Sequence, residues 1–175
     1  MLEDLIISKA RTGDRGAQKK LYQLYSKGWF GVCLRYNKNR ADAEDVLQNA
    51  LIKIFGKMNQ FDESKAKFIT WSSKIVVNEN LQYLKQKRSF QNFDDFPTNA
   101  LIEENETQID RFDAEELTAM VQKLPAGYRT VFNLYVMEGY THQEISQILG
   151  ISVGTSKSQL SKSKQMLRKK IEVLL

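Results

Sequence analysis

The stretch YTHQEISQILGISVGTSKSQLSKSKQMLRKK, Tyr140 to Lys170, contains two apolar-periodic runs separated by a short break. The apolar residues of the first run recur at helical spacing: Ile145, Ile148 and Leu149. After them, Gly150 can adopt the left-handed conformation that ends a helix, and Ser152 is a suitable N-cap for the next one. The stretch therefore predicts a helix, a tight turn and a second helix.

The second of these helices has two different faces on a wheel of about 100° per residue. The apolar stripe consists of Leu160, Leu167 and Ile171, with Ser156 and Ser163 beside it. The opposite face is polar and basic, with Thr155, Ser158, Gln159, Lys162 and Lys169. Such side chains suit the major groove of DNA, where Gln and Lys reach base edges and Lys neutralises phosphates. The alternative is a solvated helix in an all-helical bundle.

Composition limits the other classes of protein. The 175 residues are 42% hydrophobic, enough for one ordinary domain or two small ones. The net charge of +5 allows a polyanionic partner without identifying one. Cys33 is the only cysteine, which excludes a disulfide framework and a cysteine zinc cluster, and it is expected to be a small core residue. We find no signal peptide or membrane-length apolar run and expect a cytoplasmic protein.

The pattern along the chain predicts helices throughout and no strand. The expected helices cover 2–12, 14–36, 41–58, 66–87, 114–123, 126–137, 143–149 and 153–174. Between Ser89 and Asp113 the periodicity fails, and the stretch from Asp94 to Glu116 holds nine acidic residues against Arg111. We therefore predict an all-α chain with an N-terminal domain over 1–90, an acidic linker over 91–113 and a helix-turn-helix domain over 114–175.

The stretch DAEDVLQNALIKIFGKM, Asp42 to Met58, predicts a helix with a partly exposed second face. Its core stripe consists of Ala43, Leu47, Ala50, Leu51, Ile54 and Met58. The other side groups Asp45, Gln48, Asn49 and Ile52. Ile52 is therefore expected to be exposed. A single exposed isoleucine is ordinary, so this pattern alone leaves open whether the face binds a partner.

The stretch FITWSSKIVVNENLQYLKQKR, Phe68 to Arg88, combines aromatic rings with a basic end. Phe68, Trp71, Ile75 and Asn78 share one side, and Lys85, Lys87 and Arg88 crowd the end. Rings that stack on bases and cations that follow the backbone are typical of proteins that hold unpaired nucleic acid. Core packing is the alternative for Trp71 and Ile75. The polar Asn78 and the basic end favour a functional role.

These three stretches in this order, with LPAGYRTVFNLYVMEGY before the last, resemble the bacterial RNA polymerase sigma factors of the extracytoplasmic-function group. The resemblance covers nearly the whole chain. It implies a subunit that directs bacterial core RNA polymerase to promoter DNA and assists melting, with no cofactor and no catalytic residue of its own. It also implies an anti-sigma factor as a partner.

The resemblance gives each surface an expected partner. Asp45, Gln48, Asn49 and Ile52 would dock on the largest subunit of the polymerase. Trp71, Asn78, Lys85, Lys87 and Arg88 would handle the melted downstream promoter element, and the loop 59–67 would hold an extruded base. The linker would thread toward the active centre of the polymerase. Thr155, Ser158, Gln159 and Lys162 would face the upstream element.

The chain departs from the family pattern at several of these positions. Ser156 occupies a position that is usually apolar, and Gln159 and Lys162 stand where arginines are frequent. Ser146 replaces a frequent alanine, and Gln82 a frequent aspartate. These departures indicate either an altered sequence preference or a weaker contact with the upstream element.

Two other classes of protein are alternatives to a sigma factor. A free-standing helix-turn-helix regulator would use its first module for sensing or dimerisation, and it would footprint DNA without polymerase. An enzyme would need a nucleophile, base or metal constellation, whereas the only histidine, His142, lies within the DNA-binding pattern as an expected exposed polar residue.

Overall fold

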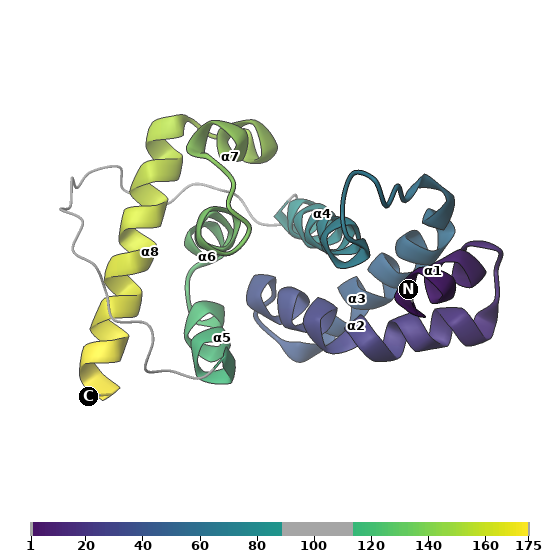
Figure 1. Ribbon diagram of the computed structural model, residues 1–175. Coiled ribbons are helices and arrows are strands. Elements are labelled where there is room, and N and C mark those ends of the chain that lie inside the picture. The colour runs from purple at the N-terminus through teal and green to yellow at the C-terminus, as the bar shows by residue number, and fades with distance from the viewer. Residues whose placement is uncertain (1, 89–113, 175) are drawn as a thin grey trace. The chain divides into compact units, whose positions relative to one another are not determined.

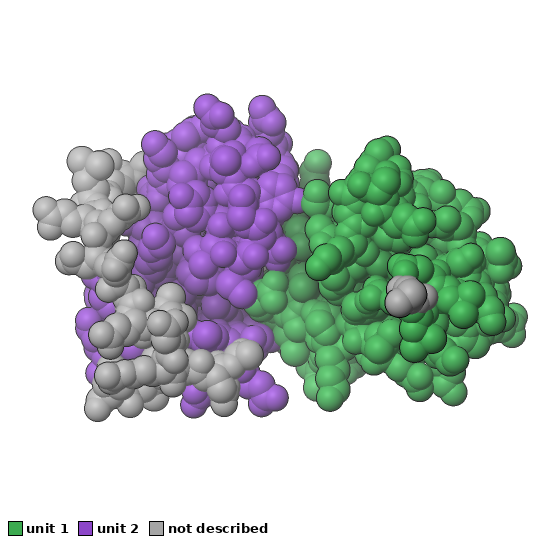
Figure 2. Space-filling view, in the orientation of Figure 1, with its two compact units in different colours: residues 1–92 green, residues 93–175 purple. Residues whose placement is uncertain are grey.

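The computed structural model describes residues 2–88 and 114–174, and the predicted linker over 91–113 lies outside these ranges. All the regular elements of the described residues are helices, with no strand among them. The chain divides into two compact units, Met1–Asn92 (unit 1) and Phe93–Leu175 (unit 2), which Figure 2 colours separately. The prediction of an all-α chain with two helical domains is confirmed.

Unit 1 consists of the helices α1 (Leu2–Arg11), α2 (Arg15–Tyr36), α3 (Arg40–Gly56) and α4 (Phe68–Arg88), with the short 3₁₀ helix η1 (Met58–Gln60) after α3 (Figure 1). The starts of α2 and α3 follow from their capping residues. Asp14 accepts a hydrogen bond from the backbone N–H of Ala17 (2.7 Å), and Asn39 accepts one from that of Asp42 (2.8 Å). Each bond satisfies a backbone donor that has no partner within the helix.

The core of unit 1 lies where α2, α3 and α4 pack against one another, while α1 packs on α2. Its largest side chains with almost no exposed surface are Leu21, Trp29, Tyr36, Val46, Ile54, Met58, Phe68 and Val76. The buried Nε1 of Trp29 donates to Ser72 Oγ (3.1 Å), so the indole N–H is paired inside the core. Of the predicted α3 stripe, all residues are buried except Leu51, which is half-buried.

Unit 2 consists of α5 (Ala114–Gln122), α6 (Ala126–Phe132), the π-helix η2 (Asn133–Met137), α7 (His142–Leu149) and α8 (Val153–Leu174). The long helix α8 packs on α5, α6 and α7 (Figure 1). Its apolar stripe is buried as predicted, at Leu160, Leu167 and Ile171. The predicted continuous helix 126–137 is wrong in one respect, because its second half is a π-helix.

The prediction of a helix over 143–149, a tight turn and a helix over 153–174 is confirmed, with α7 beginning one residue earlier, at His142. Thr141 and Glu144 form a capping box at the start of α7, where each side chain bonds to the other residue's backbone N–H. Gly150 ends α7 with a φ of +67°, in the region that a side chain disfavours. Ser152 Oγ accepts from the backbone N–H of Thr155 (2.9 Å) and caps α8.

Candidate functional site

The outer face of α3 presents one large apolar side chain among polar ones. Asp45, Gln48, Asn49 and Ile52 are all exposed and recur at i, i+3, i+4 and i+7, so they form one stripe (the α3 face). Ile52 is 72% exposed, which confirms the prediction that it lies outside the core. The structure therefore offers a polar stripe with an apolar residue at one end, a composition suited to a protein contact.

The start of α4 brings Trp71 into an aromatic cluster. Its ring lies 5.3 Å from that of Phe61 and 5.8 Å from that of Phe68, measured between ring centroids. Trp71 is nevertheless half-buried, in contrast to Trp29, which has no exposed surface. Trp71 therefore packs in the aromatic cluster while part of its surface stays exposed, and its contact with unpaired DNA stays a prediction. Asn78, two turns along α4, is exposed.

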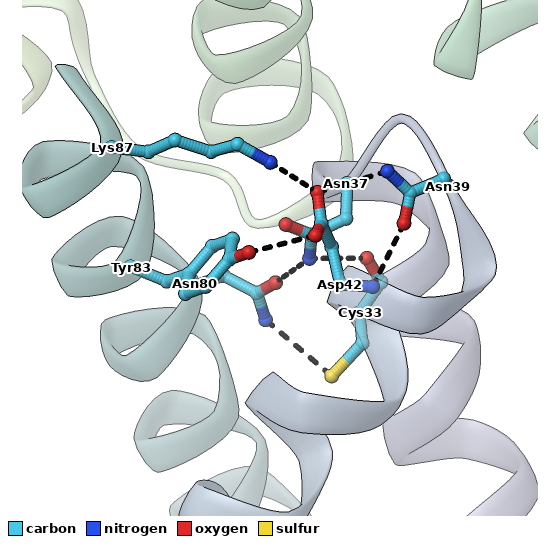
Figure 3. A network of polar contacts seen from close by, with 7 residues as sticks. All are labelled: Cys33, Asn37, Asn39, Asp42, Asn80, Tyr83 and Lys87. Carbon is cyan, nitrogen blue, oxygen red and sulfur yellow. Dashed lines mark hydrogen bonds and ion pairs between the residues drawn. The ribbon is translucent and has the colours of Figure 1, made fainter. Parts of the chain in front are cut away.

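The basic end of α4 is less uniform than the sequence suggests. Lys85 is exposed, and the side chain of Arg88 lies outside the described residues. Lys87 is exposed, but its Nζ makes an ion pair with Asp42 Oδ2 at 2.5 Å, and it lies 5.4 Å from the centroid of the Tyr83 ring. Lys87, which the sequence predicts to contact DNA, is therefore already paired with Asp42 (Figure 3).

Asp42 joins the first turn of α3 to the last turns of α4. Its carboxylate accepts from Tyr83 Oη (2.8 Å), from Lys87 and from Asn39 Nδ2 (3.1 Å) (Figure 3). Burial alone raises the pKa of Asp42, but the bonds from Lys87 and Tyr83 outweigh it and hold that pKa below its usual value. The bond to Asp42 raises the pKa of Lys87 in return.

This carboxylate makes the stability of unit 1 depend on pH. Because the folded pKa of Asp42 is depressed, its contribution is complete above the unfolded pKa and is lost as the pH falls through the folded value. We expect Asp42→Asn to be less stable than the native chain near neutral pH and to lose less stability below about pH 4. An acid titration followed by tryptophan fluorescence measures this in unit 1, because Trp29 and Trp71 are the only tryptophans. Glu44→Gln, which removes a carboxylate bonded to Arg40, is the matched control and should titrate like the native chain.

A buried polar network lies beside this ion pair, between α2 and α4. Asn37 Nδ2 donates to Asn80 Oδ1 (2.6 Å) and to the carbonyl of Cys33 (2.9 Å). Asn80 Nδ2 donates to the carbonyl of Val76 (2.8 Å) and lies 3.6 Å from Cys33 Sγ (Figure 3). Cys33 has no exposed surface, as predicted, and burial raises the pKa of its thiol to about 11. The network therefore fixes the register of α2 against α4.

In unit 2, α8 carries the residues that were predicted to face DNA, and the prediction is wrong for one of them. Thr155, Ser158 and Lys162 are half-buried. Gln159 is only 7% exposed, and its amide lies against Gly127 of α6, where an added Cβ would come within 3.3 Å of Nε2. The prediction that Gln159 faces outward is therefore wrong. Gly127 has no side chain, which leaves room for the amide of Gln159 between the helices.

His142 and Ser156 link the two helices of the helix-turn-helix. His142 Nδ1 lies 2.8 Å from Ser156 Oγ, and its ring stacks on Tyr135 with centroids 4.4 Å apart. Burial, then the charges of Lys157 and Lys164, lower the pKa of His142. His142 is half-buried rather than exposed, and Ser156, which has no exposed surface, obtains a hydrogen-bond partner in its usually apolar position.

Two features of unit 2 were missed from the sequence. Lys157 and Lys164 are exposed on α8, and their charges act on His142 of α7. Three successive apolar residues of η2 are partly exposed, with values of 39% for Tyr135, 42% for Val136 and 49% for Met137. The run of four apolar residues from Leu134 to Met137 was itself the available signal, because one helix face cannot bury four consecutive side chains.

Two family models match the chain. The model described as Sigma-70 region 2 matches residues 21–90, and the model described as Sigma-70, region 4 matches residues 114–167. The first match covers most of α2, α3 and α4, and the second includes the helix-turn-helix. Both sets of surfaces described above therefore lie within the matched regions.

Curated relatives match over almost their full length. The chain is 29% identical to the ECF RNA polymerase sigma factor SigW of Bacillus subtilis, with 96% of each chain covered. It is 26% identical to the ECF RNA polymerase sigma-E factor of Haemophilus influenzae, with 100% of this chain and 98% of that one covered. These matches extend across both units and the segment between them.

A solved structure shares the fold. The structure of CnrH in complex with the cytosolic domain of CnrY matches with a TM-score of 0.53 and 16% identity, over 99% of both chains. None of the helices within 2–88 and 114–174 is long and apolar enough to cross a membrane. From the two family models and the full-length relatives, we conclude that the chain belongs to the sigma-70 family and is a sigma factor of its extracytoplasmic-function group.

Proposed function

We propose that the two units of this sigma factor divide promoter recognition between them while unit 1 also binds the polymerase. Unit 1 docks on core RNA polymerase through the α3 face and holds the melted downstream element with α4. Unit 2 binds the upstream element with α8. The observation that carries the docking part of this proposal is the exposed stripe of Asp45, Gln48, Asn49 and Ile52, because an apolar side chain within such a polar stripe suits a partner's surface.

The contacts of α4 divide the downstream surface into two kinds of residue. Trp71 offers a partly accessible ring on which a base can stack, and Asn78 is exposed along the same helix. Lys85 is exposed and suits a phosphate contact, whereas Lys87 has to exchange Asp42 for a phosphate. We therefore assign the principal roles to Trp71, Asn78 and Lys85, and a conditional one to Lys87.

On α8, the proposed contacts with the upstream element are Thr155, Ser158 and Lys162. Gln159 is left out because its amide packs against α6. A lysine on this surface adds affinity through phosphates whatever the sequence, while the hydroxyls reach base edges. The upstream contact is thus modest by itself and gains from the polymerase tether that unit 1 provides.

The proposed function needs no chemistry from the chain itself. The polymerase catalyses RNA synthesis, and the sigma factor acts by binding, which places it in the cytoplasm with the polymerase. We also propose that an anti-sigma factor binds it. Support for this partner comes from the CnrH structure, a complex with the cytosolic domain of CnrY, and from that of the sigma factor RpoE with the anti-sigma factor NepR from Bartonella quintana.

Footprinting tests this division of labour. The chain alone is expected to bind promoter DNA weakly and to lose the binding as salt rises, because its contacts with DNA are few and largely electrostatic. Its complex with core polymerase is expected to protect two spaced elements on the same DNA. A tight, sequence-specific footprint from the chain alone would contradict the proposal, because the polymerase would then be unnecessary for recognition.

A further inference from the structure

Arg11, the last residue of α1, bonds to a segment fifty residues further along the chain. Its guanidinium Nη2 donates to the backbone carbonyl of Phe61 at 3.0 Å, at a partly buried site. Phe61 follows η1 and begins the connection to α4. A guanidinium keeps its charge at any physiological pH, so this hydrogen bond is charge-assisted and stronger than one between neutral groups.

The residue that Arg11 holds also supports Trp71. Phe61 is 5% exposed, and its ring packs edge-on against Phe68 with centroids 5.5 Å apart. The ring of Phe61 also contacts that of Trp71, with centroids 5.3 Å apart. A displacement of the backbone at Phe61 would therefore move the ring against which the accessible tryptophan packs.

The hydrogen bonds and the ion pair of the next residues of this connection are mainly with one another. Asp62 Oδ1 accepts from the backbone N–H (3.0 Å) and the hydroxyl (2.6 Å) of Ser64, and the carboxylate pairs with Lys65. Within the described part of the chain, Arg11 is the only side chain from another helix that hydrogen-bonds to residues 58–67. The position of this loop relative to Trp71 thus depends on Arg11 and on the buried ring of Phe61.

We infer that Arg11 is a positioning residue for the downstream-element surface. Its hydrogen bond holds the first residues of the loop 59–67 in place against Trp71. The position of the loop in turn determines which DNA base the loop and the ring accept together. Loops carry binding residues but need support from a rigid scaffold to present them in one geometry. This inference rests on the proposed function, since it assumes that Trp71 contacts the melted downstream element, and it adds that the loop 59–67 holds an extruded base beside this ring.

The test compares Arg11→Gln and Arg11→Lys with the native chain, each bound to core polymerase, in transcription from a library randomised in both promoter elements. Arg11→Gln should reduce the preference at one or two downstream positions by roughly fivefold or more, the discrimination that one good base contact supplies. Preference at the upstream element should stay unchanged, because α8 lies in the other unit. Arg11→Lys, which keeps the charge, should recover part of the downstream preference.

Lys9→Gln provides the matched control, since it removes the same charge from an exposed position of α1. Its preferences should equal those of the native chain. Unchanged downstream preference in Arg11→Gln overturns the inference. If Arg11→Gln does not fold, Arg11→Lys decides, and an equal loss of transcription at all promoter positions in that variant overturns the inference. If the native chain selects no element with core polymerase, the proposed function itself fails, which is a different outcome.

Discussion

The double variant Ile52→Asp, Gln48→Ala is expected to bind core RNA polymerase roughly a hundredfold more weakly than the native chain. Both side chains are exposed on α3, and Ile52 has 72% of its surface accessible, so neither contributes to the core. Buried in an interface, the new carboxylate would lose its hydration without gaining a partner, which costs several kcal/mol of association. Promoter-dependent transcription should fall in parallel.

Stability separates this effect from misfolding. Exposed substitutions away from buried features usually change the free energy of unfolding by only about 0.5 kcal/mol, so the melting temperature and helical content should stay near the native values. Leu5→Asp is the matched control, because Leu5 is 54% exposed on α1 and the change introduces the same charge. Unchanged affinity of the double variant for core polymerase would show that the α3 face is not the docking surface.

The second large effect is expected from Asn80→Asp in unit 1. The Nδ2 of Asn80 donates to the carbonyl of Val76 at 2.8 Å, and the residue has no exposed surface. Aspartate has the same shape, but its second oxygen would face that carbonyl as another acceptor. An unpaired buried charge of this kind typically costs roughly 3 to 5 kcal/mol. Denaturant unfolding followed by tryptophan fluorescence measures the loss in unit 1, which contains both tryptophans.

Asn80→Ala provides the comparison, because it removes the amide without introducing a charge. It should destabilise unit 1 by only about 1 to 3 kcal/mol, mainly by leaving Asn37 without one acceptor. The difference between the two variants should shrink at acidic pH, where the buried carboxyl becomes protonated. Equal stability of Asn80→Asp and the native chain at neutral pH would mean that the network does not hold α2 against α4.

Periodicity predicted the parts of the structure that depend on local chemistry. The caps of α7 and α8 and the left-handed Gly150 follow from residues within a few positions of each helix end, so the helix-turn-helix was predictable. The exposure of Ile52 was predictable for the same reason, since the strong apolar stripe of α3 leaves the opposite face outside the core. Both are cases in which one helix wheel contains the needed information.

The residues whose position the sequence did not predict are those whose contacts come from distant parts of the chain. Gln159 lies at the edge of the polar face of α8. Its amide is buried because Gly127, on another helix, has no side chain and leaves room for it. Lys87 belongs to a basic cluster in the sequence, but Asp42, distant in sequence, pairs with it. The bond from Arg11 to Phe61 spans fifty residues between elements with no shared pattern. None of these contacts leaves a periodic signal.

The most direct test of the central claim is transcription in vitro with bacterial core polymerase, the purified chain and a library of genomic fragments, followed by sequencing of the RNA start sites. If the chain directs the polymerase through two DNA-binding units, the start sites should cluster downstream of two motifs at a fixed spacing. Lys85→Ala should weaken use of these promoters broadly, as expected for a phosphate contact, without changing either motif. Start sites that are the same with and without the chain would contradict the claim.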